Sequence, residues 1–425
     1  MSRRVVITGL GVVAANANNT RDFELALRKG QSGLRANAAM AEAGFACRVA
    51  GVPQGVDAIA ESIFEPDELL AMNSGHRYVG IAAYDAWLDA GLERPERGGE
   101  RVDWESGAVL GTGIGGMDTM GSRVVPMVDA GKVRRIGSTA VEQVMASGVS
   151  ARVAGLLGLG GQVSTNSSAC STGTEAVVEG YRRIRQGLAS RVLCGGAEAA
   201  TPYIWAGFDA MRVLCRSFNE EPEKASRPMS ASAGGFVPGA GAGVLLLESL
   251  ESARARRAPI YAEVAGAAAN CGGQRGGGSM TAPNPSGVVR CIRAALAESP
   301  IRADQVDAIN GHLTATGADS REIAAWATAL ERTPDTLPVI TSTKSMVGHA
   351  LGASGAIESV ATVLMLQRGF VHPSINCEDV HPEIEPYARA IPHGVLDMPD
   401  LRVAIKASFG FGDVNACVVF AKWDS

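Results

Sequence analysis

One cysteine of this chain stands in a setting that suits a nucleophile. Cys170 lies in the run 162–173, where a β-branched segment gives way to small and hydroxylated residues and then to helical periodicity. The pattern predicts that a strand ends before Cys170 and a helix begins after it. A helix N-terminus offers free N–H groups and partial positive charge, which favour the thiolate and lower the pKa of a cysteine. We therefore expect Cys170 to attack a substrate, although most free cysteines only pack.

Two histidines follow strand-like segments in the second half of the chain. His312 lies in the run 310–317, and His349 closes the run 344–349. Histidine is the usual acid, base or polar anchor near neutral pH, so both are candidates for chemistry. The four other histidines are expected in turns or on the surface, and these are His76, His372, His381 and His393.

The elements that position these residues occur twice. Segment 162–173 resembles segment 339–355, since each reads as a short strand, a turn rich in small residues and a helix. Two further pairs of segments repeat in the same order, 102–113 with 306–317 and 5–9 with 261–266. We expect a duplicated α/β unit, with strands covered by helices.

The repeat places the boundary between the two units near residues 251–259. The predicted units are 1–255, which carries a helical insertion and Cys170, and 256–425, which carries both candidate histidines. Around a pseudo-two-fold axis the strand ends before Cys170 and His349 meet. These two residues are therefore predicted neighbours.

Composition excludes several classes of protein. The 425 residues are 46% hydrophobic and carry a net charge of −5, which argues against a nucleic-acid partner. No apolar run reaches the ~20 residues that cross a bilayer, so no membrane association is expected. The eight cysteines include no C-x-x-C pair, so we expect reduced thiols in a cytoplasmic protein and neither disulfides nor a zinc site.

A glycine-rich loop offers a competing interpretation. Gly111, Gly113 and Gly116 follow an apolar segment with the spacing of a dinucleotide-binding loop. No convincing acidic residue for a ribose follows about 20 residues later, where the chain reads Arg134-Arg135. A dehydrogenase is therefore disfavoured.

Taken together, the motifs resemble the β-ketoacyl-ACP synthase family, in its elongating branch with a Cys-His-His triad. The resemblance covers essentially the whole chain, and its motifs lie at 6–11, 113–116, 168–170, 225–228, 235–237, 312–316, 342–349 and 408–412. It implies the thiolase-like α/β fold, in which duplicated βαβαβαββ halves form five layers, αβαβα. It also implies an acyltransferase that extends an acyl chain by decarboxylative condensation with malonyl-ACP.

The resemblance implies a role for each motif residue. Cys170 would take the acyl group, and His312 and His349 would hold the malonyl thioester and stabilise its enolate. Phe411 would gate the acyl pocket, and its backbone N–H would share the oxyanion with that of Cys170. Lys344 would support the histidine pair, with Glu358 as its buried partner. The remaining site residues would be Thr314 and Thr316 on the pantetheine arm, Ile114 and Phe208 along the acyl pocket, and Arg212, Arg134 and Arg135 toward the carrier protein.

The family also implies partners and leaves alternatives open. The phosphopantetheine arrives on the acyl carrier protein, so no cofactor or metal of the enzyme's own is expected. Departures from the family pattern, such as Leu313 in place of glycine, leave open a fatty-acid or a specialised pathway, such as polyene or type II polyketide synthesis. We expect a homodimer, with a heterodimer containing a chain-length-factor homologue as the alternative. A thiolase would need a second reactive cysteine, but Cys417 lies in an apolar strand-like run.

Overall fold

The computed structural model describes residues 3–94, 96 and 99–424. Ten strands form one hydrogen-bonded sheet in the order β10-β9-β13-β14-β8-β1-β7-β6-β4-β5. Their bounds are β1 Val5–Val13, β4 Ser106–Gly111, β5 Val163–Ser164, β6 Arg191–Glu198, β7 Gly241–Ser249, β8 Ala262–Cys271, β9 Ala308–Asn310, β10 Val339–Thr341, β13 Val403–Gly410 and β14 Val414–Lys422.

The order of the strands has an internal symmetry. Outward from the centre, one side runs β1-β7-β6-β4-β5 and the other β8-β14-β13-β9-β10. On each side the two inner contacts are antiparallel and the two outer ones parallel. The two sides are joined between β1 and β8 by the pairs Val6 with Glu263 and Ile7 with Ala262. The predicted duplication of the fold is confirmed.

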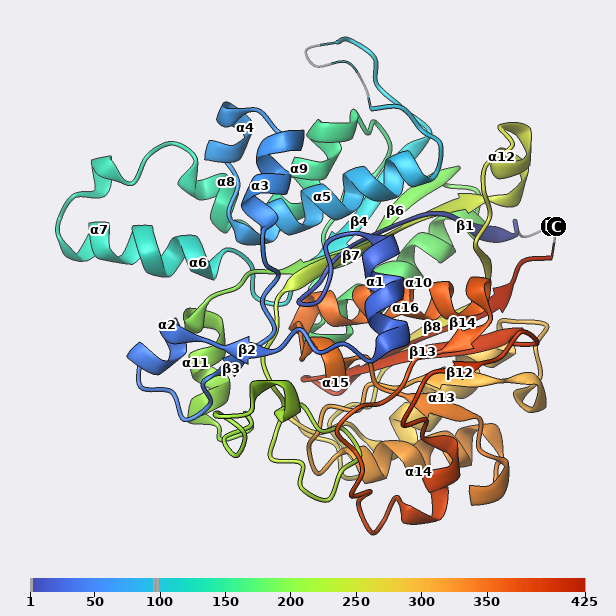
Figure 1. Cartoon of the computed structure of the whole chain (residues 1–425). Helices are drawn as coiled ribbons and strands as arrows, with labels where there is room; N and C mark the ends of the chain where they lie inside the picture. Colours follow the sequence, from blue (N-terminus) through green and yellow to red (C-terminus); the bar gives the residue numbers. More distant parts are fainter. Residues whose placement is uncertain (1–2, 95, 97–98, 425) are drawn as a thin grey trace.

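Helices form three layers around the two halves of the sheet (Figure 1). Helices α10 (Thr172–Arg185) and α16 (Ser354–Arg368) lie between the halves and contact strands of both. The outer layers are α5 (Ser74–Asp89) and α9 (Gly148–Leu157) on one side, and α13 (Pro285–Ala297) and α14 (Asp319–Leu330) on the other. This arrangement gives the predicted five layers.

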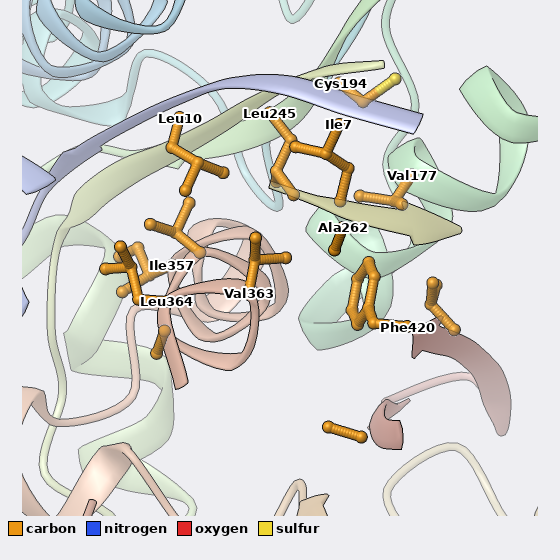
Figure 2. Close-up of a cluster of buried hydrophobic side chains, with 14 of the residues drawn as sticks. Ile7, Leu10, Val177, Cys194, Leu245, Ala262, Ile357, Val363, Leu364 and Phe420 are labelled. Atoms are coloured by element: carbon orange, nitrogen blue, oxygen red, sulfur yellow. The ribbon is translucent and has the colours of Figure 1, made fainter. Parts of the chain in front are cut away.

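The central helix α16 is buried on all sides because sheets cover both of its faces. In α16 every residue from Ser354 to Leu366 is buried, so this helix shows no polar face. Ile357, Val363 and Leu364 of α16 pack toward Leu10 and Leu245 of the upper strands (Figure 2). Burying one such side chain contributes roughly 1.5–3 kcal/mol, so this core holds the two strand ends of the site in a fixed relation.

Smaller elements surround this core. Between β1 and α5 lie α1 (Thr20–Lys29), β2 (Arg35–Ala36), α2 (Ala38–Glu42), β3 (Val49–Ala50), α3 (Val56–Ile63) and α4 (Pro66–Leu70). An arm projects from the N-terminal half and contains α6 (Met117–Thr119), α7 (Val125–Asp129) and α8 (Ala140–Val144) (Figure 1). The other helices are α11 (Pro202–Ala210), α12 (Leu250–Ala255) and α15 (Lys344–Val347), and β11 (Phe370–Val371) pairs with β12 (Leu396–Asp397).

Two features near these elements bear on the sequence-based expectations. Helix α12 connects β7 to β8, at the place where the boundary between the units was predicted. His76, expected on the surface, is instead buried in the first turn of α5, where its imidazole accepts the backbone N–H of Asn73. Burial lowers the pKa of His76 to about 4. Within the described residues, no helix is both long and apolar enough to cross a membrane.

Candidate active site

Cys170 occupies a tight turn at the beginning of the central helix α10. The turn Ala169–Ser171 is a single 3-10 turn, and Ala169 adopts a left-handed φ of +47°. Gly410, at the end of β13, approaches this turn so closely that a Cβ there would lie 3.1 Å from the backbone nitrogen of Cys170. The predicted strand-to-helix placement of Cys170 is confirmed, and glycine is required where the second half of the chain closes over it.

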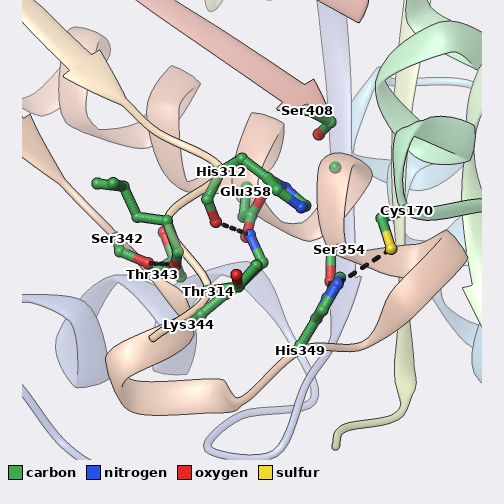
Figure 3. Close-up of polar contacts among 12 residues, drawn as sticks. Cys170, His312, Thr314, Ser342, Thr343, Lys344, His349, Ser354, Glu358 and Ser408 are labelled. Atoms are coloured by element: carbon green, nitrogen blue, oxygen red, sulfur yellow. Dashed lines mark hydrogen bonds and ion pairs between the residues drawn. The ribbon is translucent and has the colours of Figure 1, made fainter. Parts of the chain in front are cut away.

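His349 lies directly against the nucleophile. Its Nε2 is 3.1 Å from Sγ of Cys170, and its Nδ1 is 2.9 Å from Oγ of Ser354 (Figure 3). A hydroxyl can donate or accept, so Ser354 satisfies either tautomer of the neutral imidazole. The predicted contact between Cys170 and His349 is confirmed.

The residues that correspond between the two halves are not the ones expected from the sequence. The turn Ala169–Ser171 corresponds to Leu351–Ala353, since both are 3-10 turns that precede a central helix and begin with φ near +46°. Gly352 is therefore the counterpart of Cys170, and His349 lies just before the equivalent turn. The two residues still meet because both turns end at the same face of the central layer.

His312 completes a compact group with Cys170 and His349. Its ring lies 5.4 Å from that of His349, at an interplanar angle of 83°. The loop after β9 is held by Glu322, whose carboxylate accepts the backbone N–H of His312 at 2.6 Å and that of Leu313 at 2.7 Å. The backbone carbonyl of His312 accepts a hydrogen bond from Nζ of Lys344 at 2.6 Å (Figure 3).

Burial sets the protonation of the group. The pKa of His312 and that of His349 are held well below the usual range by burial, and the positive charge of Lys344 acts in the same direction. Both imidazoles are therefore neutral near pH 7. Burial also raises the pKa of the Cys170 thiol to about 11, opposed by Lys344 and by a backbone hydrogen bond from Phe411. The expectation of a lowered pKa is wrong, because enclosure by both halves outweighs the local turn.

A cavity of about 480 Å³ leads to this group. Besides Cys170 and the two histidines, four of the predicted site residues line it, namely Phe208, Thr314, Thr316 and Phe411. The hydroxyls of Thr314 and Thr316 lie 3.0 Å apart on one side. The rings of Phe208 and Phe411 lie 6.0 Å apart on the apolar side. The structure thus brings together the predicted reactive, pantetheine and acyl positions.

Other predicted residues lie outside the cavity wall. Ile114 is 46% exposed and is not among the lining residues. Glu358 is buried behind the histidine pair, where it contacts Lys344 and not the cavity. Arg212 is exposed beside the lining residues Met211 and Val213, at the mouth. Arg134 and Arg135 are exposed on a turn of the projecting arm, η2 (Val133–Arg135).

Four residues that sequence reasoning missed support the site: Glu198, Glu322, Ser354 and Lys406. Glu198 accepts the backbone N–H groups of Gly113 and Gly352, each at 2.9 Å, and that of Ile114 at 3.3 Å. Glu198 thus occupies the backbone N–H groups of Gly113 and Ile114 in the glycine-rich loop. These N–H groups are therefore not free to bind a dinucleotide phosphate. A charged side chain within an apolar strand is the signal that would have revealed Lys406.

The triad could also be read as a metal site. The ligand atoms of Cys170, His312 and His349 all lie within 4.8 Å of one another. Two buried ammonium groups, those of Lys344 and Lys406, lower the pKa of both histidines and so oppose a cation at the same place. Metal-free chemistry stays a prediction, and the site fits a nucleophile with two neutral imidazoles.

The five layers and the Cys-His-His group define a condensing enzyme with the thiolase-like fold. The family model of the β-ketoacyl synthase N-terminal domain matches residues 2–253, and that of the C-terminal domain matches residues 261–378. The chain therefore belongs to the β-ketoacyl synthase family. It is an acyltransferase of the condensing type.

Individual relatives span the whole chain. It is 35% identical to 3-oxoacyl-[acyl-carrier-protein] synthase 2 of Synechocystis sp., over 99% of this chain and 98% of the relative. It is 36% identical to the synthase 2 of Vibrio harveyi, over 99% of each chain. Among solved structures, the ishigamide ketosynthase/chain length factor is similar at a TM-score of 0.87, with 29% identity and full coverage of both chains. A type II polyketide ketosynthase in complex with its acyl-carrier protein, bound to the hexaketide, also has a TM-score of 0.87, at 30% identity and full coverage of both chains.

Proposed function

We propose that this chain is a 3-oxoacyl-ACP synthase in which Cys170 carries the growing acyl chain. The observation that supports this most directly is the distance of 3.1 Å between Cys170 Sγ and His349 Nε2, in a cavity that His312 also lines. Cysteine suits both steps of such a reaction, since it is a good nucleophile and a good leaving group. Residues 1–255 and 256–425 are the two proposed units of the enzyme.

The first half of the proposed reaction loads the enzyme. The thiol of Cys170 gives its proton to the neutral imidazole of His349, and the sulfur attacks the thioester carbonyl of acyl-ACP. The S–C bond to Cys170 forms, the S–C bond to pantetheine breaks, and the proton leaves with the pantetheine thiol. The backbone N–H groups of Cys170 and Phe411 are the proposed oxyanion donors.

The second half extends the chain. Malonyl-ACP enters, and His312 and His349 donate hydrogen bonds to its thioester carbonyl oxygen. The C–C bond to the carboxylate breaks, CO₂ leaves, and the electron pair forms an enolate. Its carbon attacks the acyl carbon, the S–C bond to Cys170 breaks, and the Cys170 thiolate takes up a proton from solvent water. Two neutral imidazoles suit this step, because each presents one N–H without carrying charge.

The proposed carrier is an acyl carrier protein, which also supplies the phosphopantetheine, so that the enzyme needs no cofactor of its own. Thr314 and Thr316 are positioned along the cavity for the pantetheine arm, and exposed Arg212 at the mouth suits an acidic carrier. Arg134 and Arg135 are also assigned to the carrier, from an exposed turn of the arm. The eight unpaired cysteines support a reducing compartment, which we propose is the cytoplasm.

The quaternary state has two candidates. The arm exposes large apolar side chains, including Val128 at 50%, Val133 at 59% and Val141 at 75%. Exposed groups of this kind mark a protein interface, and we propose that a second copy of the chain covers them. A chain-length-factor homologue is the alternative, favoured by the likeness to the ishigamide assembly. Sedimentation of the purified chain distinguishes a stable homodimer from a chain that requires another subunit.

Mass spectrometry of the acylated enzyme tests the central proposal. The protein is incubated with acyl-ACP substrates of several lengths, alongside the variants Cys170→Ala and Cys271→Ala. Cys271 is the exposed cysteine among the described residues, so it controls for nonspecific acylation. We expect one acyl group on the wild type and on Cys271→Ala, and none on Cys170→Ala. Equal acylation of Cys170→Ala would show that the assignment is wrong.

A further inference from the structure

Two lysines and one glutamate are buried together behind the histidine pair. Lys406 is 0% exposed, and Lys344 and Glu358 are each 1% exposed. Lys406 lies in the middle of β13, between Ile405 and Ala407, in a strand that is buried along its whole length. Lysine is almost never fully buried unless it is paired, so we expect buried Lys406 to have a specific role.

The three side chains form a chain of contacts that ends at His312. Lys406 Nζ lies 2.8 Å from one carboxylate oxygen of Glu358, and the other oxygen of Glu358 accepts a hydrogen bond from Lys344. Lys344 then donates to the backbone carbonyl of His312. Lys406 is also paired in the sheet with Asn310, two residues before His312. Lys406 thus contacts both the strand and the ion pair that place this histidine.

The group carries more positive than negative charge. Among the described residues, Glu358 is the one carboxylate within 4 Å of either ammonium group. Glu322 acts on Lys406 from further away and raises its pKa, but burial raises the pKa of Glu322 itself to about 7, although backbone N–H groups of the His312 loop oppose this rise. Two cations therefore share one close anion inside the protein.

We propose that Lys406 is a positioning residue for the decarboxylation step of the function proposed above. It holds Glu358, and through it Lys344, against the loop of His312, and it supplies positive charge that has no anion of its own until the enolate forms. The excess charge opposes protonation of His312 and His349, so both imidazoles stay neutral donors. The positive charge is therefore already in place to stabilise an anion that forms beside the two imidazoles.

This role predicts an unusual combination of stability and activity. A buried charge without its own counter-ion is unfavourable for folding. Lys406→Met removes that charge and leaves Lys344 and Glu358 as a balanced pair. The variant should therefore unfold at the same temperature as the wild type or higher, while the reaction slows. A lysine with a merely structural role would show the opposite, lower stability with both half-reactions affected alike.

The experiment compares Lys406→Met with Lys406→Arg, which keeps the charge, and with Lys422→Met as a control at the end of β14. Acylation of Cys170 by acyl-ACP is followed by intact mass, and decarboxylation of malonyl-ACP is followed separately. Lys406→Met should acylate within about threefold of wild type but decarboxylate at least about tenfold more slowly, since losing one electrostatic contact to a developing anion has effects of this order or larger. Lys406→Arg should recover most of the loss, and Lys422→Met should match the wild type.

The pH profile of decarboxylation provides a second measurement. Lys406 helps to lower the pKa of both histidines, so its removal raises them, and the fall in rate on the acidic side should move to higher pH. An equal loss in both half-reactions, an unmoved profile, no rescue by arginine, or a variant that fails to fold would each overturn the inference. A wild type that neither acylates nor decarboxylates would instead overturn the proposed function.

Discussion

Replacing Glu358 by glutamine removes the one carboxylate shared by Lys344 and Lys406 and changes the size of the side chain little. All three groups are at most 1% exposed, so water cannot substitute for the lost charge. Removing one partner of a buried ion pair costs about 3–5 kcal/mol. Each kcal/mol shifts the unfolding midpoint by roughly 2–4 °C in a unit of 150–250 residues, so we expect Glu358→Gln to unfold roughly 6–20 °C below the wild type at neutral pH.

The deficit should depend on pH with a definite sign. Burial holds the pKa of Lys406 below its usual range. A lysine whose folded pKa is depressed destabilises the fold below its unfolded pKa, and this penalty fades as the pH rises toward that value. Without Glu358, which opposes this effect of burial, the pKa of Lys406 falls further. The difference between variant and wild type should therefore be larger at about pH 7 than at about pH 9.5.

Thermal unfolding followed by circular dichroism at both pH values measures this difference. Glu220→Gln is the matched control, because Glu220 also forms an ion pair, with Arg48, but is 87% exposed. An exposed pair contributes about 0–1 kcal/mol, so the control should remain within a few degrees of the wild type. A Glu358→Gln midpoint indistinguishable from that of Glu220→Gln, or a deficit that grows at high pH, would refute the electrostatic reasoning.

Three further outcomes follow from the geometry of the site. Gly410→Ala should slow acylation by about tenfold or more, because a shift of the nucleophile turn by a fraction of an ångström disturbs the attack, whereas Gly394→Ala, where nothing lies within 4 Å of the new Cβ and which is outside the cavity lining, should not. Alkylation of Cys170 by iodoacetamide should keep rising with pH through about pH 10, since the thiol pKa is about 11, and a plateau near pH 8 would contradict this. Ser354→Ala removes the hydrogen bond to His349 and should lower the condensation rate by about 2–10-fold, within the range of one neutral hydrogen bond, which steady-state kinetics at saturating substrate would measure.

The sequence allowed the fold and the reactive group to be predicted because both depend on local patterns that occur twice. Three pairs of similar segments follow one another in the same order, and this indicated the duplication; Gly187 and Gly369, both with a left-handed φ, follow the two central helices at equivalent positions. The equivalence of Cys170 with Gly352 was not predicted, because the matching features of the two halves are the 3-10 turns and not the reactive side chains. The contact was nevertheless predicted correctly, because both turns end at the same face of the central layer.

What could not be predicted depends on residues far apart in the chain. The pKa of Cys170 follows from how completely the second half covers it, which no local segment encodes. The shared carboxylate of Glu358 joins helix α16 to strand β13, and only the packed structure brings Lys406 to it. The lysine itself was visible as a charge amid Val403, Ile405 and other apolar residues, but its partner was not.

The two halves of the sheet are equivalent, but of their two equivalent turns one carries the nucleophile and the other does not. Gly352 stands where a second nucleophile would be, but a Cβ at this position would come within 2.4 Å of the backbone nitrogen of Gly113. The space that holds a thiol on one side of the axis is filled by the glycine-rich loop and Glu198 on the other. Titration with a covalent acyl donor should therefore saturate at one equivalent per chain, however many subunits assemble.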